Sequence, residues 1–297
     1  MSITKQVSLH GKRAYVSKDN QVGARNGFVA GGVGKPAIVL PGSPDTVAIF
    51  DDFLGDTGRA LRGNTDRLWR VLDGDTGNDT GSNVTLVPGT SGIMRIAISS
   101  TNSHAGPTIA VTNGMGINQS LSWKGNQAAY PRVHNGLRFG CRIKSSGHDD
   151  TGRRMNMFAG FTDSIALEAP VYDTGGALQA TANDAVGFWY SPGADTGWSA
   201  LAVKGGGTPT SVALDATRKS SNSNTYDVLE LELTHADTGY AQVRFYINGQ
   251  SKGEIDSPIA MNVALTPIIY AWQSDTGGGG LVDVDWINVS APRDSGL

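Results

Sequence analysis

The chain has 297 residues, a net charge of −3, one cysteine, and no run of 18 apolar residues. The single cysteine excludes a disulfide framework, and without an apolar run we expect no membrane-spanning helix. Glycine is abundant, at 40 residues, whereas glutamate occurs only four times. This balance favours an all-β chain with many turns.

Residues 1–45 are basic and glycine-rich, and carry a net charge of +4 against about −7 for the remainder. They have no sustained period of 2 or 3.6, so we expect an extended N-terminal docking arm ahead of one domain at 46–297. The arm can bury apolar side chains on a partner while its basic residues neutralise acidic surface. The alternative is a disordered tail with no partner. The expected docking residues are Arg25, Phe28, Val29, Lys35, Ile38, Val39 and Leu40.

The first residues of the chain contain neither an apolar core nor a cleavage site typical of a signal peptide. We therefore expect a protein made and used in a cytoplasm, or exported by a route other than secretion.

The tripeptide Asp-Thr-Gly occurs eight times. One interpretation is the active-site tripeptide of aspartic proteases, where two carboxylates share a proton. The other is turn chemistry, because Asp accepts hydrogen bonds from the amides that follow it and Gly adopts positive φ. Polar and glycine-rich flanks favour turns. Copies at Asp56, Asp150, Asp195, Asp237 and Asp275 lie between the strands predicted next.

From residue 46 onward, alternating apolar runs are separated by turn clusters. The connections are too short for parallel crossovers, so an antiparallel two-sheet jelly-roll sandwich is expected. The predicted strands are 47–54, 68–72, 93–99, 137–145, 156–162, 185–190, 199–204, 229–233, 243–247, 268–273 and 281–289.

The clearest hairpin follows residues 243–247, where Asn248-Gly249 predicts a type I′ turn. Its expected neighbour is the strand 229–233, with Glu230 and Glu232 facing outward within cross-strand reach of Arg244. In the strand 137–145, the alternation points Cys141 inward. Residues 100–136 break the strand rhythm, which leaves two alternatives: contact with a partner, or a wrapped loop with an extra strand.

Several segments together resemble concanavalin A-like, or laminin-G-like, jelly-roll domains, and most closely those of tailed-bacteriophage virion proteins. The resemblance spans about residues 47–290. Its segments are PheAspAspPheLeuGly, GlyLeuArgPheGlyCysArgIleLys, MetPheAlaGlyPheThrAsp, AsnAspAlaValGlyPheTrpTyr, ValArgPheTyrIleAsnGly and LeuValAspValAspTrpIleAsnVal. In such folds the first and last strands are neighbours, which would pair 47–54 with 281–289.

The resemblance implies a non-enzymatic virion structural protein, such as a capsid decoration, cement or head-fibre protein. Its expected partners are the major capsid protein or other virion proteins, its location the virion assembled in the host cytoplasm, and its oligomeric state a trimer. The alternative is a receptor- or carbohydrate-binding module of a tail fibre. Nucleic-acid binding by the body is disfavoured by its negative charge.

The same fold also hosts glycoside hydrolases and polysaccharide lyases. Its glucanases use Glu-x-Asp-x-x-Glu on one strand to place two carboxylates on one face. Here Glu254-Ile255-Asp256 is followed by Ser257-Pro258 and lacks the second Glu. His104, His134, His148 and His235 lie in or beside predicted loops, so no shared histidine site is expected. We predict no catalytic residues.

The sequence offers two candidate binding sites, one for calcium and one for a glycan. Pairing of the end strands would bring Asp51, Asp52, Asp283 and Asp285 together as calcium ligands, but strand-edge charges that block further pairing are the favoured interpretation. No metal or cofactor is therefore expected. A glycan platform would use Trp189, Tyr190 and Trp198 around the Asp195 turn, whereas core packing is the commoner role of such residues.

Overall fold

The computed structural model describes the chain in a series of separate ranges. These ranges are 3–9, 12–17, 46–51, 53, 69–73, 83–87, 92–98, 112–117, 121–122, 137–146, 155–163, 169–173, 177–191, 197–214, 225–235, 241–260, 263–273 and 280–292. Their regular structure is entirely β-strand. Within these ranges there is no long apolar helix of the kind that spans a membrane.

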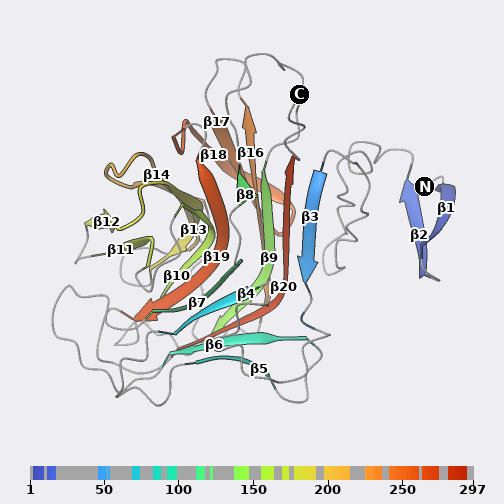
Figure 1. Ribbon diagram of the computed structural model, residues 1–297, viewed down its shortest axis with the longest axis horizontal. Coiled ribbons are helices and arrows are strands. Elements are labelled where there is room, and N and C mark those ends of the chain that lie inside the picture. Colours follow the sequence, from blue (N-terminus) through green and yellow to red (C-terminus); the bar gives the residue numbers. More distant parts are fainter. Residues whose placement is uncertain are drawn as a thin grey trace.

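Two eight-stranded antiparallel sheets form the body (Figure 1). Sheet 1 has the order β15-β14-β13-β10-β19-β7-β4, and β8 also pairs with β19. Its strands are β4 (Trp69–Asp73), β7 (Thr112–Ile117), β8 (Leu121–Ser122), β10 (Met155–Thr162), β13 (Ala185–Tyr190), β14 (Ser199–Val203), β15 (Thr210–Ala213) and β19 (Ala264–Gln273).

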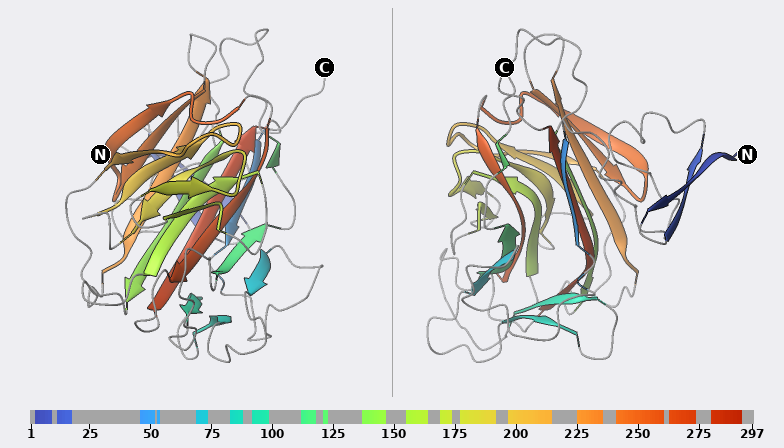
Figure 2. Two further views of the ribbon diagram at one scale, coloured as in Figure 1. Left: turned by 90° about the vertical axis from the view of Figure 1, so that its left-hand side faces the viewer. Right: turned by 45° about the vertical axis from the view of Figure 1, so that its right-hand side comes forward.

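Sheet 2 has the order β18-β17-β16-β9-β20-β6-β5, and β3 also pairs with β20. Its strands are β3 (Thr46–Asp51), β5 (Asn83–Leu86), β6 (Met94–Ile98), β9 (Arg138–Ser146), β16 (Asp227–His235), β17 (Ala241–Ile247), β18 (Gln250–Asp256) and β20 (Gly280–Pro292). The turned views in Figure 2 show the two sheets stacked face to face. The predicted all-β sandwich is confirmed.

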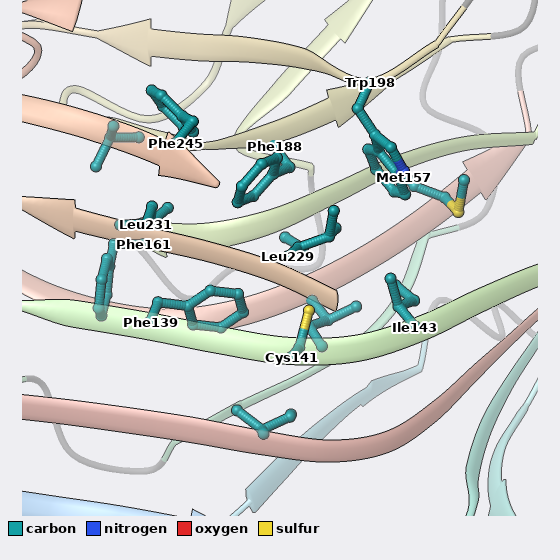
Figure 3. Close-up of a cluster of buried hydrophobic side chains, with 14 of the residues drawn as sticks. Phe139, Cys141, Ile143, Met157, Phe161, Phe188, Trp198, Leu229, Leu231 and Phe245 are labelled. Carbon is teal, nitrogen blue, oxygen red and sulfur yellow. The ribbon is translucent and has the colours of Figure 1, made fainter. Parts of the chain in front are cut away.

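The core lies between the facing sides of the two sheets. Alternate residues of each strand point inward, as period-2 geometry requires, so Phe139 of sheet 2 meets Phe161 of sheet 1 edge to face at 5.8 Å. Phe188 contacts Phe245 in the same way at 5.2 Å. Figure 3 shows this cluster, in which Cys141 is fully buried as its alternation predicted.

The two ends of the sandwich sequence lie side by side, as expected. β3 pairs antiparallel with β20, from Thr46 opposite Pro292 to Asp51 opposite Ile287. β20 also pairs with β9 and β6. It is therefore an interior strand of sheet 2.

The predicted hairpin of β16 and β17 is present, with Leu231 opposite Phe245. Asn248 and Gly249 have φ of 52° and 76°, the two positive values of a type I′ turn. Arg244 stands opposite Glu232 in the register, but its ion pair is with Glu254 on β18, at 3.6 Å.

Several strands were not predicted, among them β5, β7, β8 and β15. β7 lies within the irregular segment 100–136 and pairs with both β19 and β4, so the extra strand considered for that segment exists. The arm was also expected to lack regular structure, yet β1 (Ile3–Leu9) and β2 (Lys12–Ser17) pair as an antiparallel hairpin. β11 (Val171–Asp173) and β12 (Leu178–Ala180) form another.

Candidate functional sites on the two outer sheet faces

The outer face of sheet 1 is covered by a second apolar layer. Large side chains from β10, β13, β14 and β19 point away from the inter-sheet core and are nevertheless buried. Their cover comes from residues 169–173 and 178–182, which include β11 and β12. The buried members of this outer layer are Phe158, Ala169, Val171, Ala182, Ala185, Trp189, Leu201, Val203, Ile268, Tyr270 and Trp272.

Hydrogen bonds between the two segments of this cover, residues 169–173 and 178–182, hold them together. The amides of Thr181 and Ala182 donate to the carbonyl of Pro170 at 3.1 and 3.2 Å, and the Thr181 hydroxyl donates to the carbonyl of Ala169. Beneath it, the rings of Trp189 and Trp272 lie 5.1 Å apart. The molecule is therefore three layers thick at this point: sheet 2, sheet 1 and the β11–β12 hairpin.

The possible glycan platform is not formed, because Trp189, Tyr190 and Trp198 are each at most 2% exposed. Trp189 belongs to the outer layer, whereas Tyr190 and Trp198 belong to the inter-sheet core. A sugar ring stacks only on an accessible aromatic face, so an exposed platform built on these residues was wrong. Core packing, the other interpretation, is correct.

Trp198 has a structural role that links the two sheets. Its indole nitrogen donates to the carboxylate of Asp227 at 3.0 Å, and Asn248 donates to the other oxygen of Asp227 at 3.2 Å. The Asn248 side chain also accepts from the amide of Val228 at 2.8 Å. Trp198, which directly precedes β14 of sheet 1, is thereby tied to the start of β16 and to the β17–β18 turn.

The outer face of sheet 2 is charged rather than apolar. Asp283 of β20 is 3% exposed and accepts two hydrogen bonds from Arg95 of β6, at 2.7 and 2.9 Å. Lys144 of β9 lies 3.3 Å from the same carboxylate. Two cations on neighbouring strands compensate this buried charge, which would otherwise be costly to desolvate.

A second ion pair lies beside the first. Asp285 accepts from Arg142 of β9, next to an irregularity in the β9–β20 register between Val284 and Trp286. The Arg142 guanidinium lies 4.3 Å from the centroid of the Tyr226 ring. Burial and the nearby carboxylates raise the pKa of the Tyr226 hydroxyl above its ordinary value.

These contacts correct the interpretation of the β20 aspartates. Asp283 and Asp285 were expected to be strand-edge charges, but β20 is an interior strand and both carboxylates are paired with cations. Among the described residues no three acidic, His or Cys side chains gather as metal ligands, and the calcium alternative rests on two further aspartates outside this set. Asp52 and the side chain of Asp51 lie outside the described part.

Glu230 and Glu232 lie two positions apart on β16, so both carboxylates are on the outer face of sheet 2. Burial raises the pKa of Glu230, and the charge of Arg138 opposes that rise. Glu232 is held by Arg138 in an ion pair. The sequence signal for the pairing on this face was present, since Arg138, Arg142 and Lys144 occupy alternate positions of one strand.

The remaining candidates for chemistry are dispersed. Glu254 is exposed on β18, as expected. Asp256 on the same strand accepts from Gln242 at 2.9 Å. His104, His134, His148 and the side chain of His235 lie outside the described residues, as do all the expected docking residues of the arm, Arg25, Phe28, Val29, Lys35, Ile38, Val39 and Leu40.

Comparison with known proteins identifies the fold. No protein-family model and no curated protein matches the chain. Among solved structures, the Emp47p carbohydrate recognition domain is 7% identical with a TM-score of 0.50, over 84% of this chain and 97% of that one. A Bacillus licheniformis β-glucanase is 13% identical with a TM-score of 0.47, over 83% and 98%. A β-1,3-1,4-glucanase from a mouse hindgut metagenome is 11% identical with a TM-score of 0.47, over 80% and 98%.

The body therefore shares its fold, a concanavalin A-like jelly roll, with the Emp47p carbohydrate recognition domain. At these identities the likeness establishes the fold alone, because one fold hosts many unrelated functions.

Proposed function

We propose that the chain is a non-enzymatic structural protein of a bacteriophage virion. Its jelly-roll body stands on a capsid or tail surface, and residues 1–45 attach it there. Support for the virion setting comes from the sequence resemblance and from the basic, apolar composition of the arm. The mechanism is burial of surface between protein partners, and the body carries out no chemistry.

The observation that carries the non-enzymatic part is the state of the carboxylates on sheet 2. Asp283, Asp285 and Glu232 are each held by arginine. A glycosidase requires two carboxyl groups aimed at one bond, one as acid and one as base or nucleophile. Burial raises the pKa of Glu230, and its neighbour Glu232 is held in an ion pair by Arg138.

Turnover assays test the non-enzymatic part directly. Purified protein is incubated with β-glucans, alginate and host-surface polysaccharides, and reducing ends and unsaturated products are measured. We expect no turnover. Activity that is lost in Glu230→Gln and retained in Glu254→Gln would establish an enzyme and overturn the proposal.

Attachment is tested by deleting residues 2–42 and asking whether the shortened body folds and still joins particles. We expect a folded body, by circular dichroism and thermal unfolding, that no longer co-purifies with virions. Incorporation at the wild-type level would rule out the arm as the attachment element. Counting copies in intact particles distinguishes the surfaces, since hundreds of copies indicate the shell and about a dozen indicate the tail.

A glycan-binding module of a tail fibre is the second candidate, favoured by the fold shared with a carbohydrate recognition domain. Glycan-array binding by the isolated body would support it. Trp198→Ala is unsuitable for locating the site, because this residue is buried and its loss would unfold the core.

A further inference from the structure

β15 forms one end of sheet 1 and presents an open backbone edge. It pairs with β14 through Ser199 to Ala202 opposite Ala213 to Thr210, and it is terminal in the order of the described strands. All four of its residues are exposed, so neither face of the strand is covered. Val212 is 41% exposed, the one large hydrophobic side chain so exposed in the described ranges.

The strand is nevertheless held firmly at its end. Leu214, directly after β15, is 7% exposed, and its amide donates to the carbonyl of Trp198 at 3.0 Å. Its Cδ2 fills the space beside Gly253 of β18, where an added Cβ would lie 2.9 Å away. The anchor presents the backbone groups of β15 in a fixed position, which favours pairing with an incoming strand.

This edge lacks the charges that usually prevent sheets from pairing. β18, the edge strand of sheet 2 on the same side of the sandwich, carries exposed Lys252, Glu254 and Asp256. In contrast, no charged residue occurs from 205 to 214, a run that the sequence bounds with Lys204 and Asp215.

We infer that β15 is a self-association edge, at which a second copy of this chain pairs antiparallel about a twofold axis. Val212 then stands opposite Val212 of the second copy, and Ser211 stands opposite Ala213. This register buries both exposed valines and makes a β-branched cross-strand pair. An identical strand is the occupant favoured here, because small uncharged residues meet only one another and the interface closes as a dimer.

The test uses the full chain in light scattering coupled to size-exclusion chromatography, from about 1 to 100 μM. We expect a concentration-dependent dimer. Val212→Lys places two like charges opposite each other, so its dimer dissociation constant should rise roughly tenfold or more. Ser251→Lys, an added lysine on exposed β18, is the matched control and should leave the dimer unchanged.

A covalent readout checks the register. Val212→Cys should form a disulfide-linked dimer under mild oxidation, because facing residues of an antiparallel pair have suitable Cα spacing, while Ser251→Cys should not. The native Cys141 is buried and does not interfere. A wild-type monomer at 100 μM, or an oligomer that Val212→Lys leaves intact, overturns the inference, the latter by placing self-association elsewhere. An unchanged melting temperature in Val212→Lys confirms that the variant is folded.

Discussion

At the scale of single residues, the charged outer face of sheet 2 contains one carboxylate that is almost fully buried. Asp283 is compensated by Arg95 and Lys144, whose side chains are 33% and 19% exposed. Removal of one member of such a group leaves uncompensated charge in a poorly solvated place. The partial exposure of Arg95 lets water replace part of what is lost.

Asp283→Asn is therefore expected to lower the free energy of unfolding by about 2–3 kcal/mol, measured by urea denaturation. Glu254→Gln is the matched control, because the Glu254 side chain is 56% exposed and lies 3.6 Å from Arg244. It should cost less than about 0.5 kcal/mol. Equal losses in the two variants would contradict the role assigned to burial.

Glu230 should make the stability of the fold depend on pH. Its pKa is raised mainly by burial, so the folded chain binds this proton more tightly than the unfolded chain does. The contribution of Glu230 to stability is then most favourable below its ordinary pKa and declines as pH rises through the raised value. The neutral isostere Glu230→Gln removes that decline.

Relative to Glu230→Gln, the wild type should lose stability as pH rises from below the ordinary glutamate pKa, about 4.3, through the raised pKa of Glu230. Urea unfolding of both proteins at several pH values measures this difference. A gap between the two that does not vary with pH would refute the explanation.

At the scale of elements, two glycines on paired strands differ in the space available for an added side chain. Gly160 of β10 stands opposite Gly187 of β13, and a Cβ at Gly160 would lie 2.3 Å from the carbonyl oxygen of Val186. Gly140 of β9 has more room, since an added Cβ would meet Glu230 and Trp286 at 3.5 Å. Backbone atoms cannot yield as a flexible side chain does.

Gly160→Ala should destabilise the fold by about 3 kcal/mol, whereas Gly140→Ala should change stability by less than about 1 kcal/mol. Thermal and urea unfolding of the two variants gives the comparison. A tolerated Gly160→Ala would mean that β10 and β13 are not packed as closely as described here.

The β17–β18 turn depends on its two residues for separate reasons. Gly249 has a φ of 76°, and an added Cβ there meets no atoms, so Gly249→Ala acts through backbone strain alone. It should cost about 1 kcal/mol. Asn248→Ala also loses the side-chain hydrogen bonds to Val228 and Asp227 and should cost about 2 kcal/mol. Ser251→Ala, on exposed β18, is the control in the same urea assay.

Strands with strong alternation could be located from the sequence, and strands without it could not. Residues 185–190 were predicted with the bounds that β13 has. β7 carries Asn113, Gly114 and Gly116, a poor strand composition, and exists because β19 and β4 supply hydrogen bonds on both sides. That pairing depends on distant parts of the chain, so the local sequence pattern of residues 112–117 does not predict a strand there.

The same limit explains why the sequence left a glycan platform open as an alternative to core packing. All six residues of β13 are buried, because the β11–β12 hairpin covers the side of sheet 1 that faces away from the core. By alternation Trp189 points away from the inter-sheet core, and it is nevertheless buried beneath this hairpin. The sequence carries Asp173-Thr174-Gly175 at this hairpin, which marks a turn but not where the turn packs.

At the scale of the whole molecule, the sheets are assembled largely from strands that are distant in sequence. β3 pairs with β20, and β6 pairs with the same strand. Pairing of distant strands costs loop-closure entropy before the stabilising contacts form. Proteins with such topology therefore fold slowly, over roughly milliseconds to seconds. The Asp-Thr-Gly copies at Asp56, Asp150, Asp195, Asp237 and Asp275 lie outside the described residues, at chain positions between consecutive strands, and their role as turns stays a prediction.

The pairing of Thr46 with Pro292 also decides how the body responds to force. The chain enters and leaves the sandwich at the same end of the β3–β20 ladder, so tension applied between these two points would open the ladder one hydrogen bond at a time. Tension between Thr46 and a distant strand would instead load many bonds of the ladder together. If residues 1–45 are the only tether, force enters at Thr46 and loads many hydrogen bonds of the β3–β20 ladder together. The direction of pull then matters as much as the number of hydrogen bonds in the ladder.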